Sequence, residues 1–156
     1  MTSAATGLAV LVYAMDRRSR WQSTSGNVDR EAFAERAEHY ENVLDDPERA
    51  TLLALRPDNS SAAAIGKRYL TENPRASSET AILRNLRRKL SPDGTPLNEV
   101  SYDALYNRLD IAIEHDFLTG RSLAVSGWIL AATEIELCSL VALIESKVKI
   151  PLNHVD

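Results

Sequence analysis

The chain has little that would build a disulfide framework or an all-β fold. It holds one cysteine among 156 residues, so it can form neither an internal disulfide nor a cysteine-rich zinc site. Only 6% of its residues are aromatic, and its six glycines and six prolines fall mostly between periodic segments. That distribution favours helices over many short strands.

The chain also lacks a strong charge of either sign. Its 18 Lys and Arg residues stand against 22 Asp and Glu residues, which gives a net charge of −4 and disfavours nucleic acid as a partner. With 44% hydrophobic and 26% charged residues, it has the composition of an ordinary globular domain with a real core. An acidic stretch from Asp29 to Arg49 is interpreted as a solvated helix face.

Sequence motifs for common catalytic and cofactor sites are absent. There is no phosphate-binding loop, no G-x-G-x-x-G, no G-x-S-x-G and no H-E-x-x-H. Glu35 and His39 are one helical turn apart and could share a metal, but no Glu-x-x-His pair accompanies them. We therefore predict no metal site and no cofactor, and the sequence leans against an enzyme without excluding one.

The first twenty residues hold an uncharged apolar segment, Ala4 to Met15, followed by DRRSRW. Its dozen residues fall short of the roughly 20 that a membrane-spanning helix needs. Three interpretations stay open: a helix buried in or docked on protein, a short membrane anchor, or a vestigial targeting segment. The residues predicted to contact a membrane or a partner are Leu8, Leu11, Val12, Arg17, Arg18, Arg20 and Trp21.

Composition divides the chain into four parts. Residues 1–21 form the apolar N-terminal segment, and residues 22–28, which include the flexible-looking QSTSGN, form a linker. Residues 29–150 form a helical domain, and residues 151–156 form a tail.

Start and stop signals predict a series of helices in the domain. Asp46-Pro47 starts a short helix that ends before Arg56-Pro57, Asn59 or Ser60 starts the next, and that helix ends at Asn73-Pro74. Further helices begin at Ser77 or Ser78 and at Ser101, on either side of a loop at 91–96. The residues expected to face inward are Phe33, Ala37, Tyr40, Leu44, Ile65, Tyr69, Leu70, Ile82, Leu83, Leu86, Leu90, Tyr102, Leu105, Tyr106, Leu109, Ile113 and Phe117.

The most apolar stretch, Gly127 to Glu145, is not predicted to cross a membrane. Glu134 and Glu136 lie in its middle, where each charge would cost about 2.5–3.5 kcal/mol. Thr133 and Glu136 match the capping-box pattern, so a helix is predicted from Glu134 to Val148 after an extended or strand-like segment at 122–130. Its inward face should hold Leu137, Cys138, Leu140, Val141, Leu143 and Ile144.

A basic strip, formed by Arg84, Arg87, Arg88 and Lys89, lies near the end of one predicted helix. The helix dipole by itself favours cations there. The strip is also a candidate contact for an acidic partner or for anionic lipid headgroups. Cys138 falls on an apolar helix face and is expected to be a core residue.

One run of residues resembles a known group of proteins. Gly120-Arg121, Gly127-Trp128, Leu130, Thr133-Glu134 and Cys138 form a GR…GWxLxxTE…C stretch. This stretch resembles the C-terminal part of a group of small exported bacterial proteins of unclear role, and IGKRYL at 65–70 is similar to an upstream segment of that group. The resemblance covers about half of the chain and implies no activity. Glu136 stands where the group has a basic residue, and no twin-arginine signal precedes an apolar run.

Taken together, the sequence predicts an all-α protein, a small irregular bundle of about five or six helices with an apolar N-terminal segment. The expected function is that of a non-catalytic accessory or interaction subunit of a bacterial membrane-associated complex, with a larger protein as its partner. A small soluble helical enzyme or ligand-binding domain is the alternative. The expected location is a membrane or the cell envelope, with the cytoplasm as the alternative.

Overall fold

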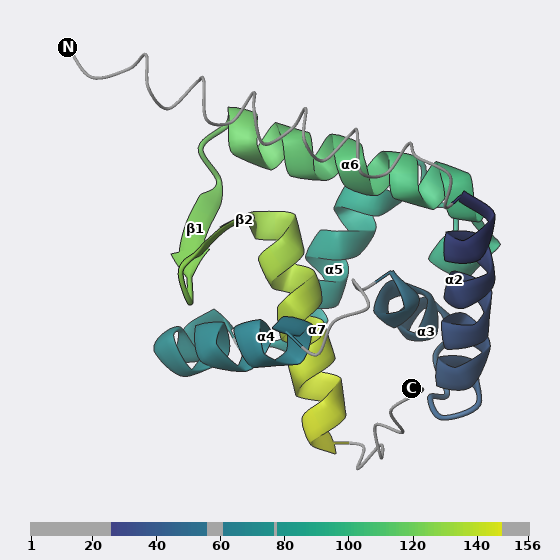
Figure 1. Ribbon diagram of the computed structural model, residues 1–156, viewed down its shortest axis with the longest axis horizontal. Helices are drawn as coiled ribbons and strands as arrows, with labels where there is room; N and C mark the ends of the chain where they lie inside the picture. Colours follow the sequence, from purple (N-terminus) through teal and green to yellow (C-terminus); the bar gives the residue numbers. More distant parts are fainter. Residues whose placement is uncertain (1–25, 56–60, 77, 148–156) are drawn as a thin grey trace.

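The computed structural model describes residues 26–55, 61–76 and 78–147, and within these ranges it confirms the all-α class (Figure 1). Six α-helices and one two-stranded sheet make up the described part. The elements are α2 (Gly26–Glu41), α3 (Pro47–Ala54), α4 (Ser61–Glu72), α5 (Glu79–Leu90), α6 (Tyr102–Leu118), β1 (Ser122–Val125), β2 (Trp128–Ala131) and α7 (Ala132–Lys147), with short 3-10 turns at Pro74–Ala76 and Leu97–Glu99.

Several predictions fall outside the described residues. These are the apolar segment Ala4–Met15 with its contact residues from Leu8 to Trp21, the stop at Arg56-Pro57, the starts at Asn59, Ser60 and Ser77, and the tail at 151–156. The predicted linker at 22–28 needs a correction, because α2 begins at Gly26. Helical periodicity marks only the face that packs, and a helix can extend beyond its last packed residue.

Local signals place three of the helix starts. The Asp46 carboxylate accepts hydrogen bonds from the backbone N–H groups of Glu48 (3.1 Å) and Arg49 (3.2 Å), and Pro47 occupies the first turn of α3. Ser78 and Ser101 cap α5 and α6 in the same manner. These caps confirm the predicted starts.

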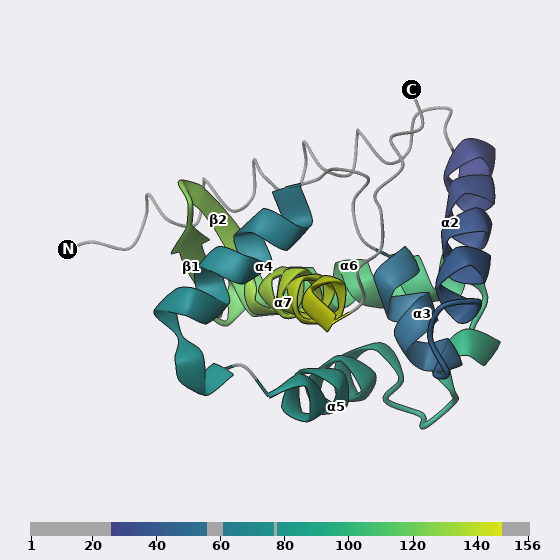
Figure 2. The ribbon, with the colours of Figure 1, turned by 90° about the horizontal axis from the view of Figure 1, so that it is seen from below.

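The C-terminal helix α7 lies at the centre of the molecule, with α4, α5 and α6 around it (Figures 1 and 2). Leu143 is half-buried, and the other predicted inward residues of α7 are all buried. The four predicted inward residues of α5 are also all buried. A helix that is apolar on several sides needs neighbours on several sides, which explains the central place of α7.

The packing of α4 corrects one prediction. Ile65, Tyr69 and Leu70 are only half-buried, whereas Ala62 and Gly66 are buried. A Cβ atom added at Gly66 would lie 2.0 Å from the backbone oxygen of Cys138 in α7. The two helices therefore cross at small residues, and this leaves the larger side chains of α4 at the margins of the contact.

The hairpin β1–β2 stands at the far end of the molecule from α2 and α3 (Figure 1). Its strands pair antiparallel, with Val125 opposite Trp128 and Leu123 opposite Leu130. Ser126 and Gly127 form a two-residue turn with φ values of 52° and 83°, as a hairpin turn of this length requires. This hairpin confirms the predicted extended segment before α7.

Candidate functional site

A buried cluster of charged and polar side chains joins α5, α6 and α7. Its centre is Asp116, in the last turn of α6, which is 0% exposed. One oxygen of its carboxylate, Oδ2, accepts a hydrogen bond from the backbone N–H of Thr133 at 2.7 Å and one from the Thr133 hydroxyl at 2.6 Å. The end of α6 is thereby tied to the first turn of α7.

Lys89, in the last turn of α5, brings a cation into the same cluster. Its Nζ atom lies 2.9 Å from the Thr133 hydroxyl, 2.9 Å from Glu136 Oε2 and 3.3 Å from Asp116 Oδ2. Its side chain is only 14% exposed. The Asn85 amide donates to the other oxygen of Glu136 at 3.1 Å. The ammonium group therefore faces three oxygen atoms of its own chain.

Arg121 connects the base of the hairpin to this cluster. Its guanidinium Nη2 lies 3.0 Å from Asp116 Oδ1 and 2.6 Å from His115 Nδ1. Its backbone N–H donates to the Asp116 carbonyl at 2.7 Å, and its own carbonyl accepts from the N–H of Ala132 at 2.9 Å. These bonds fix the point where β1 leaves α6 and where β2 enters α7.

The charges within the cluster balance. Two cations, Lys89 and Arg121, face two carboxylates, Asp116 and Glu136. Burial by itself would raise the pKa of Asp116, but the hydrogen bonds from Thr133 and the charge of Lys89 outweigh it and hold that pKa below its ordinary value. Asp116 is consequently held as a carboxylate.

The capping-box prediction for Thr133 and Glu136 is wrong. The helix α7 begins at Ala132, and the side chain that reaches back is that of Glu134, whose Oε2 accepts from the N–H of Ala131 at 2.9 Å. Thr133 bonds to Asp116 and Glu136 bonds to Lys89, as described above. A local motif could not reveal that a carboxylate from another helix binds the first turn of α7.

The predicted basic strip needs a similar correction. Arg84 and Arg88 are exposed on α5, but Lys89 belongs to the buried cluster and Arg87 pairs with Glu48 of α3. Two of the four cations are thus occupied by carboxylates of the same chain. The four residues do not form one continuous surface for an anionic partner.

The remaining candidate residues show no site of their own. Cys138 is buried, and burial raises the pKa of its thiol to about 12, so it is a protonated core residue. Glu35 and His39 are both exposed on α2. Within the described ranges there is no group of three or more His, Cys, Asp or Glu side chains that could hold a metal, and no helix long and apolar enough to cross a membrane.

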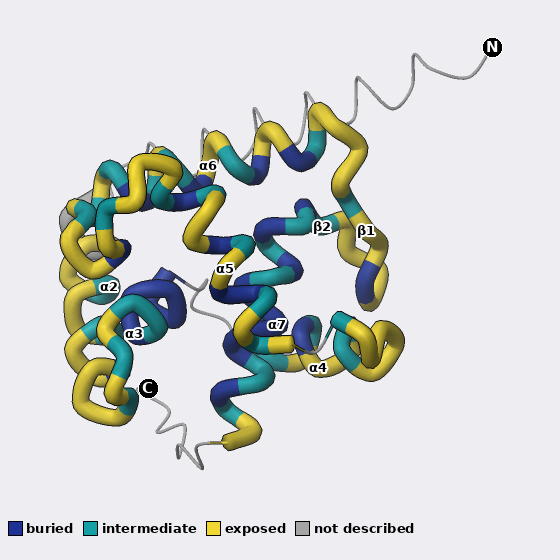
Figure 3. Tube along the Cα trace, turned by 180° about the vertical axis from the view of Figure 1, so that it is seen from behind, coloured by how far each residue is buried: buried dark blue, intermediate teal, exposed yellow. Residues whose placement is uncertain are grey.

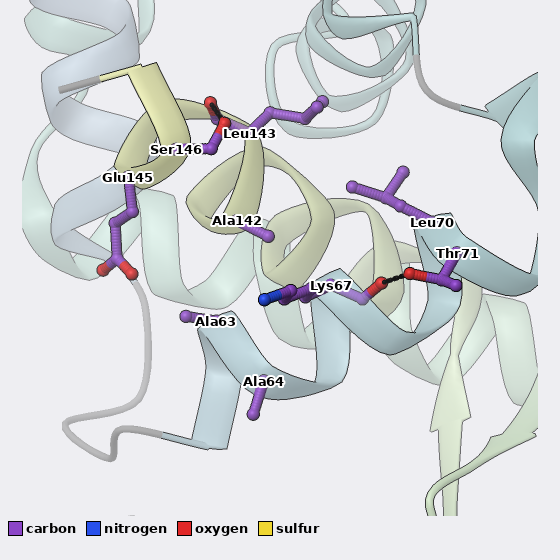
Figure 4. A pocket seen from close by; sticks show the side chains of 9 residues that line it. All are labelled: Ala63, Ala64, Lys67, Leu70, Thr71, Ala142, Leu143, Glu145 and Ser146. Atoms are coloured by element: carbon purple, nitrogen blue, oxygen red, sulfur yellow. Dashed lines mark hydrogen bonds between the residues drawn. The ribbon is translucent and has the colours of Figure 1, made fainter.

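A shallow groove of about 540 Å³ lies between α4 and α7. Figure 4 shows Ala63 and Lys67 of α4 on one side of the groove and Ala142 and Glu145 of α7 on the other. The charged cluster does not line this groove.

Large apolar side chains are exposed at the hairpin end of the molecule. Figure 3 shows most of the hairpin as exposed. The exposed fractions are 74% for Leu118 at the end of α6, 48% for Leu123 in β1, and 63% and 65% for Trp128 and Ile129 in β2. Exposed apolar residues are common singly, but several at one end of a molecule are typical of an interaction site.

No model of a protein family matches the chain, and searches of curated proteins and of solved structures find no match either.

Proposed function

We propose that the chain is a non-catalytic interaction subunit of a membrane-associated complex and that its hairpin end contacts a larger protein. The observation that carries this proposal is the exposure of Leu118, Leu123, Trp128 and Ile129. Tryptophan is one of the residues that most often contribute the largest share of the binding energy at protein interfaces. Summed over the four side chains, the exposed apolar area is on the order of 500 Å².

The buried cluster supports an anchoring role for its residues. The carboxylates of Asp116 and Glu136 and the ammonium group of Lys89 all bind groups of the same chain. Such a cluster holds both ends of the hairpin in place, and a rigid element loses less entropy when it binds a partner.

The membrane part of the proposal rests on the composition of the N-terminal segment. Ala4 to Met15 has no charged side chain, and Arg17, Arg18 and Arg20 follow it. A helix of twelve residues would be about 18 Å long, short of the roughly 30 Å hydrocarbon core. Attraction of the arginines to anionic lipid would add on the order of 1 kcal/mol for each residue close to the surface.

The test is to purify the tagged full-length chain from the cells that naturally produce it and to measure its molar mass by light scattering. We expect a stoichiometric complex with another protein in the membrane fraction. Trp128→Ser should release the chain from this complex, whereas Val43→Ser should not, because Val43 is exposed in the turn between α2 and α3. A monomeric chain under gentle extraction would contradict the proposal.

The membrane contact is tested separately by flotation with anionic and neutral liposomes. The full-length chain should float with anionic liposomes, and a chain without residues 1–20 should not. We expect the shortened chain to keep its helical circular dichroism and its cooperative unfolding. If neither liposome binds the full-length chain, its N-terminal segment attaches to protein and not to lipid.

A further inference from the structure

The side of α6 that faces away from the core carries two large apolar residues. Ile111 is 57% exposed and Leu118 is 74% exposed. They are seven positions apart, about two helical turns, so they lie on the same side of the helix. The buried residues Leu109 and Ile113 lie on the opposite side, and Figure 3 shows exposed stretches along the outer side of α6. The outer side of α6 is therefore partly apolar, and no described element covers it.

Negative charge accompanies these two apolar residues. Asp110 directly precedes Ile111, and Glu114 lies between Ile111 and Leu118. The exposed residues of α6 from Asn107 to Leu118 include these two carboxylates and no Lys or Arg. A binding segment that is both apolar and basic would match this surface.

The chain enters α2 beside the first turn of α6 (Figure 1). Nε of Arg30 in α2 lies 3.2 Å from Oδ1 of Asp103 in α6. The rings of Phe33 and Tyr102 pack edge to face, with their centroids 5.1 Å apart. Gly26, the first residue of α2, precedes Arg30 by about one helical turn. The residues that come before Gly26 in the chain are thus attached next to the start of α6.

Those preceding residues have the length and the charge to follow α6. In a helix, Arg17–Arg20 would lie about 9–14 Å before Gly26, and Ala4–Met15 about 16–33 Å before it. Asp110 lies about 12 Å along α6 from the first residue of that helix, and Leu118 about 24 Å. Arginines would then lie opposite carboxylates, and apolar residues opposite Leu118. An extended chain would reach further, at about 3.3 Å for each residue.

We propose that Ala4–Arg20 folds back along the outer side of α6 and covers Ile111 and Leu118 of the same chain. A separate protein would need an interface of roughly 1,200 Å², and two side chains provide only a small part of that area. A tethered segment needs less, because a short linker holds it at an effective concentration on the order of 1 mM. The size of the surface therefore favours a segment of this chain as its occupant.

Docking on α6 excludes simultaneous contact of the segment with a membrane. It is therefore the state of the chain away from lipid, and transfer of the segment to anionic lipid would uncover Leu118. Leu118 is one of the four residues proposed to contact the larger protein. This link between membrane and partner rests on the function proposed above, whereas the docking itself does not.

Photo-crosslinking of the purified full-length chain, without lipid, tests the docking. Leu11 is replaced by p-benzoylphenylalanine in one sample and Ala9, on the opposite side of a helix, in another. Trypsin cleaves after Arg108 and Arg121, so residues 109–121 form one peptide that contains the proposed surface. We expect mass spectrometry to find this peptide crosslinked within a single chain from at least one of the two positions.

Two variants of α6 test the contacts themselves. Ile111→Ser removes an apolar side chain and Glu114→Arg reverses a charge, and each should lower the yield of this crosslink roughly threefold or more. Val43→Ser and Asp45→Arg make the same kinds of change at exposed positions between α2 and α3 and should leave the yield unchanged. Circular dichroism and the urea midpoint verify that each variant folds.

Four results would overturn the inference. Crosslinks mainly to α4 and α7 would place the segment in the groove between those helices. Crosslinked dimers without a product within one chain would show that it binds a second copy. Equal yields for the α6 variants and their controls would show that the contact is not specific, and absence of crosslinks from both positions would show that no docking occurs. The proposed function would survive each result, because co-purification and flotation test it separately.

Discussion

Asp116 of α6 accepts two hydrogen bonds from Thr133 of α7, one from the backbone N–H and one from the hydroxyl, although 17 positions separate the two residues. The N–H groups in the first turn of an α-helix have no partner within that helix. At α7 the Asp116 carboxylate of a neighbouring helix supplies one for Thr133, and Glu134 of α7 accepts from the N–H of Ala131 just before the helix. The position of the central helix is therefore coupled to the end of α6 and to the hairpin between them.

Loss of the Asp116 charge should destabilise the fold. In Asp116→Asn the side chain keeps its shape, but Lys89 and Arg121 lose the carboxylate that they share. Removal of one partner from a buried ion pair costs about 3 kcal/mol or more, and we expect a decrease of that size in the free energy of unfolding in urea. Asp93→Asn is the control, because Asp93 pairs with Arg108 at a half-exposed site. Equal losses for the two variants would show that Asp116 is no anchor.

The Thr133 hydroxyl should matter more than its methyl group. In the structure it donates to Asp116 and accepts from Lys89. Thr133→Val keeps the branched shape but leaves both buried partners with one bond fewer, so we expect a loss of about 1–3 kcal/mol. Thr133→Ser keeps the hydroxyl and should retain most of the stability. If the serine variant is the weaker of the two in urea unfolding, packing of the methyl group dominates.

Acid should weaken the native state through Asp116. Burial alone would raise the pKa of this carboxyl, but Thr133 and Lys89 lower it below its ordinary value. A group with a lowered pKa in the folded state stabilises that state above the unfolded-state value of about 3.9, and this contribution disappears as the pH falls through the folded-state pKa. The unfolding free energy of Asp116→Asn should therefore fall less steeply than that of the wild type between about pH 5 and pH 2. Parallel curves would assign the acid sensitivity to other carboxylates.

The helix crossing at Gly66 should tolerate no side chain. Alanine normally stabilises a helix interior by about 1 kcal/mol relative to glycine. At this position the added Cβ would lie 2.0 Å from the Cys138 backbone oxygen, so α4 or α7 would have to move. We expect Gly66→Ala to lower the free energy of unfolding by about 1–3 kcal/mol. Because the obstacle is backbone, Cys138→Ala should not rescue the variant; rescue would place the clash with the thiol instead.

Residues that are close in sequence determined much of this fold. The caps at Asp46, Ser78 and Ser101 depend on hydrogen bonds that reach two or three residues along the chain, so local pattern was enough to predict them. The inward faces of α5 and α7 followed from helical spacing for the same reason. Asp116 also follows Leu109 and Ile113 at helical spacing, and this spacing alone predicts that Asp116 lies on the inward face of α6.

Only the tertiary structure decided which distant groups meet. Lys89 lies 27 positions from Asp116 and 47 from Glu136, and no periodicity within one helix links them. The same holds for Gly66. By helix propensity alone it would destabilise α4, and only the packing of α7 against it shows why this position has no side chain. The sequence likewise did not reveal that Trp128 and Ile129 are exposed, because both lie in the most apolar stretch of the chain. Local hydrogen bonding and side-chain spacing fix the elements, whereas the partners of buried charges and the surfaces left uncovered depend on how the elements pack together.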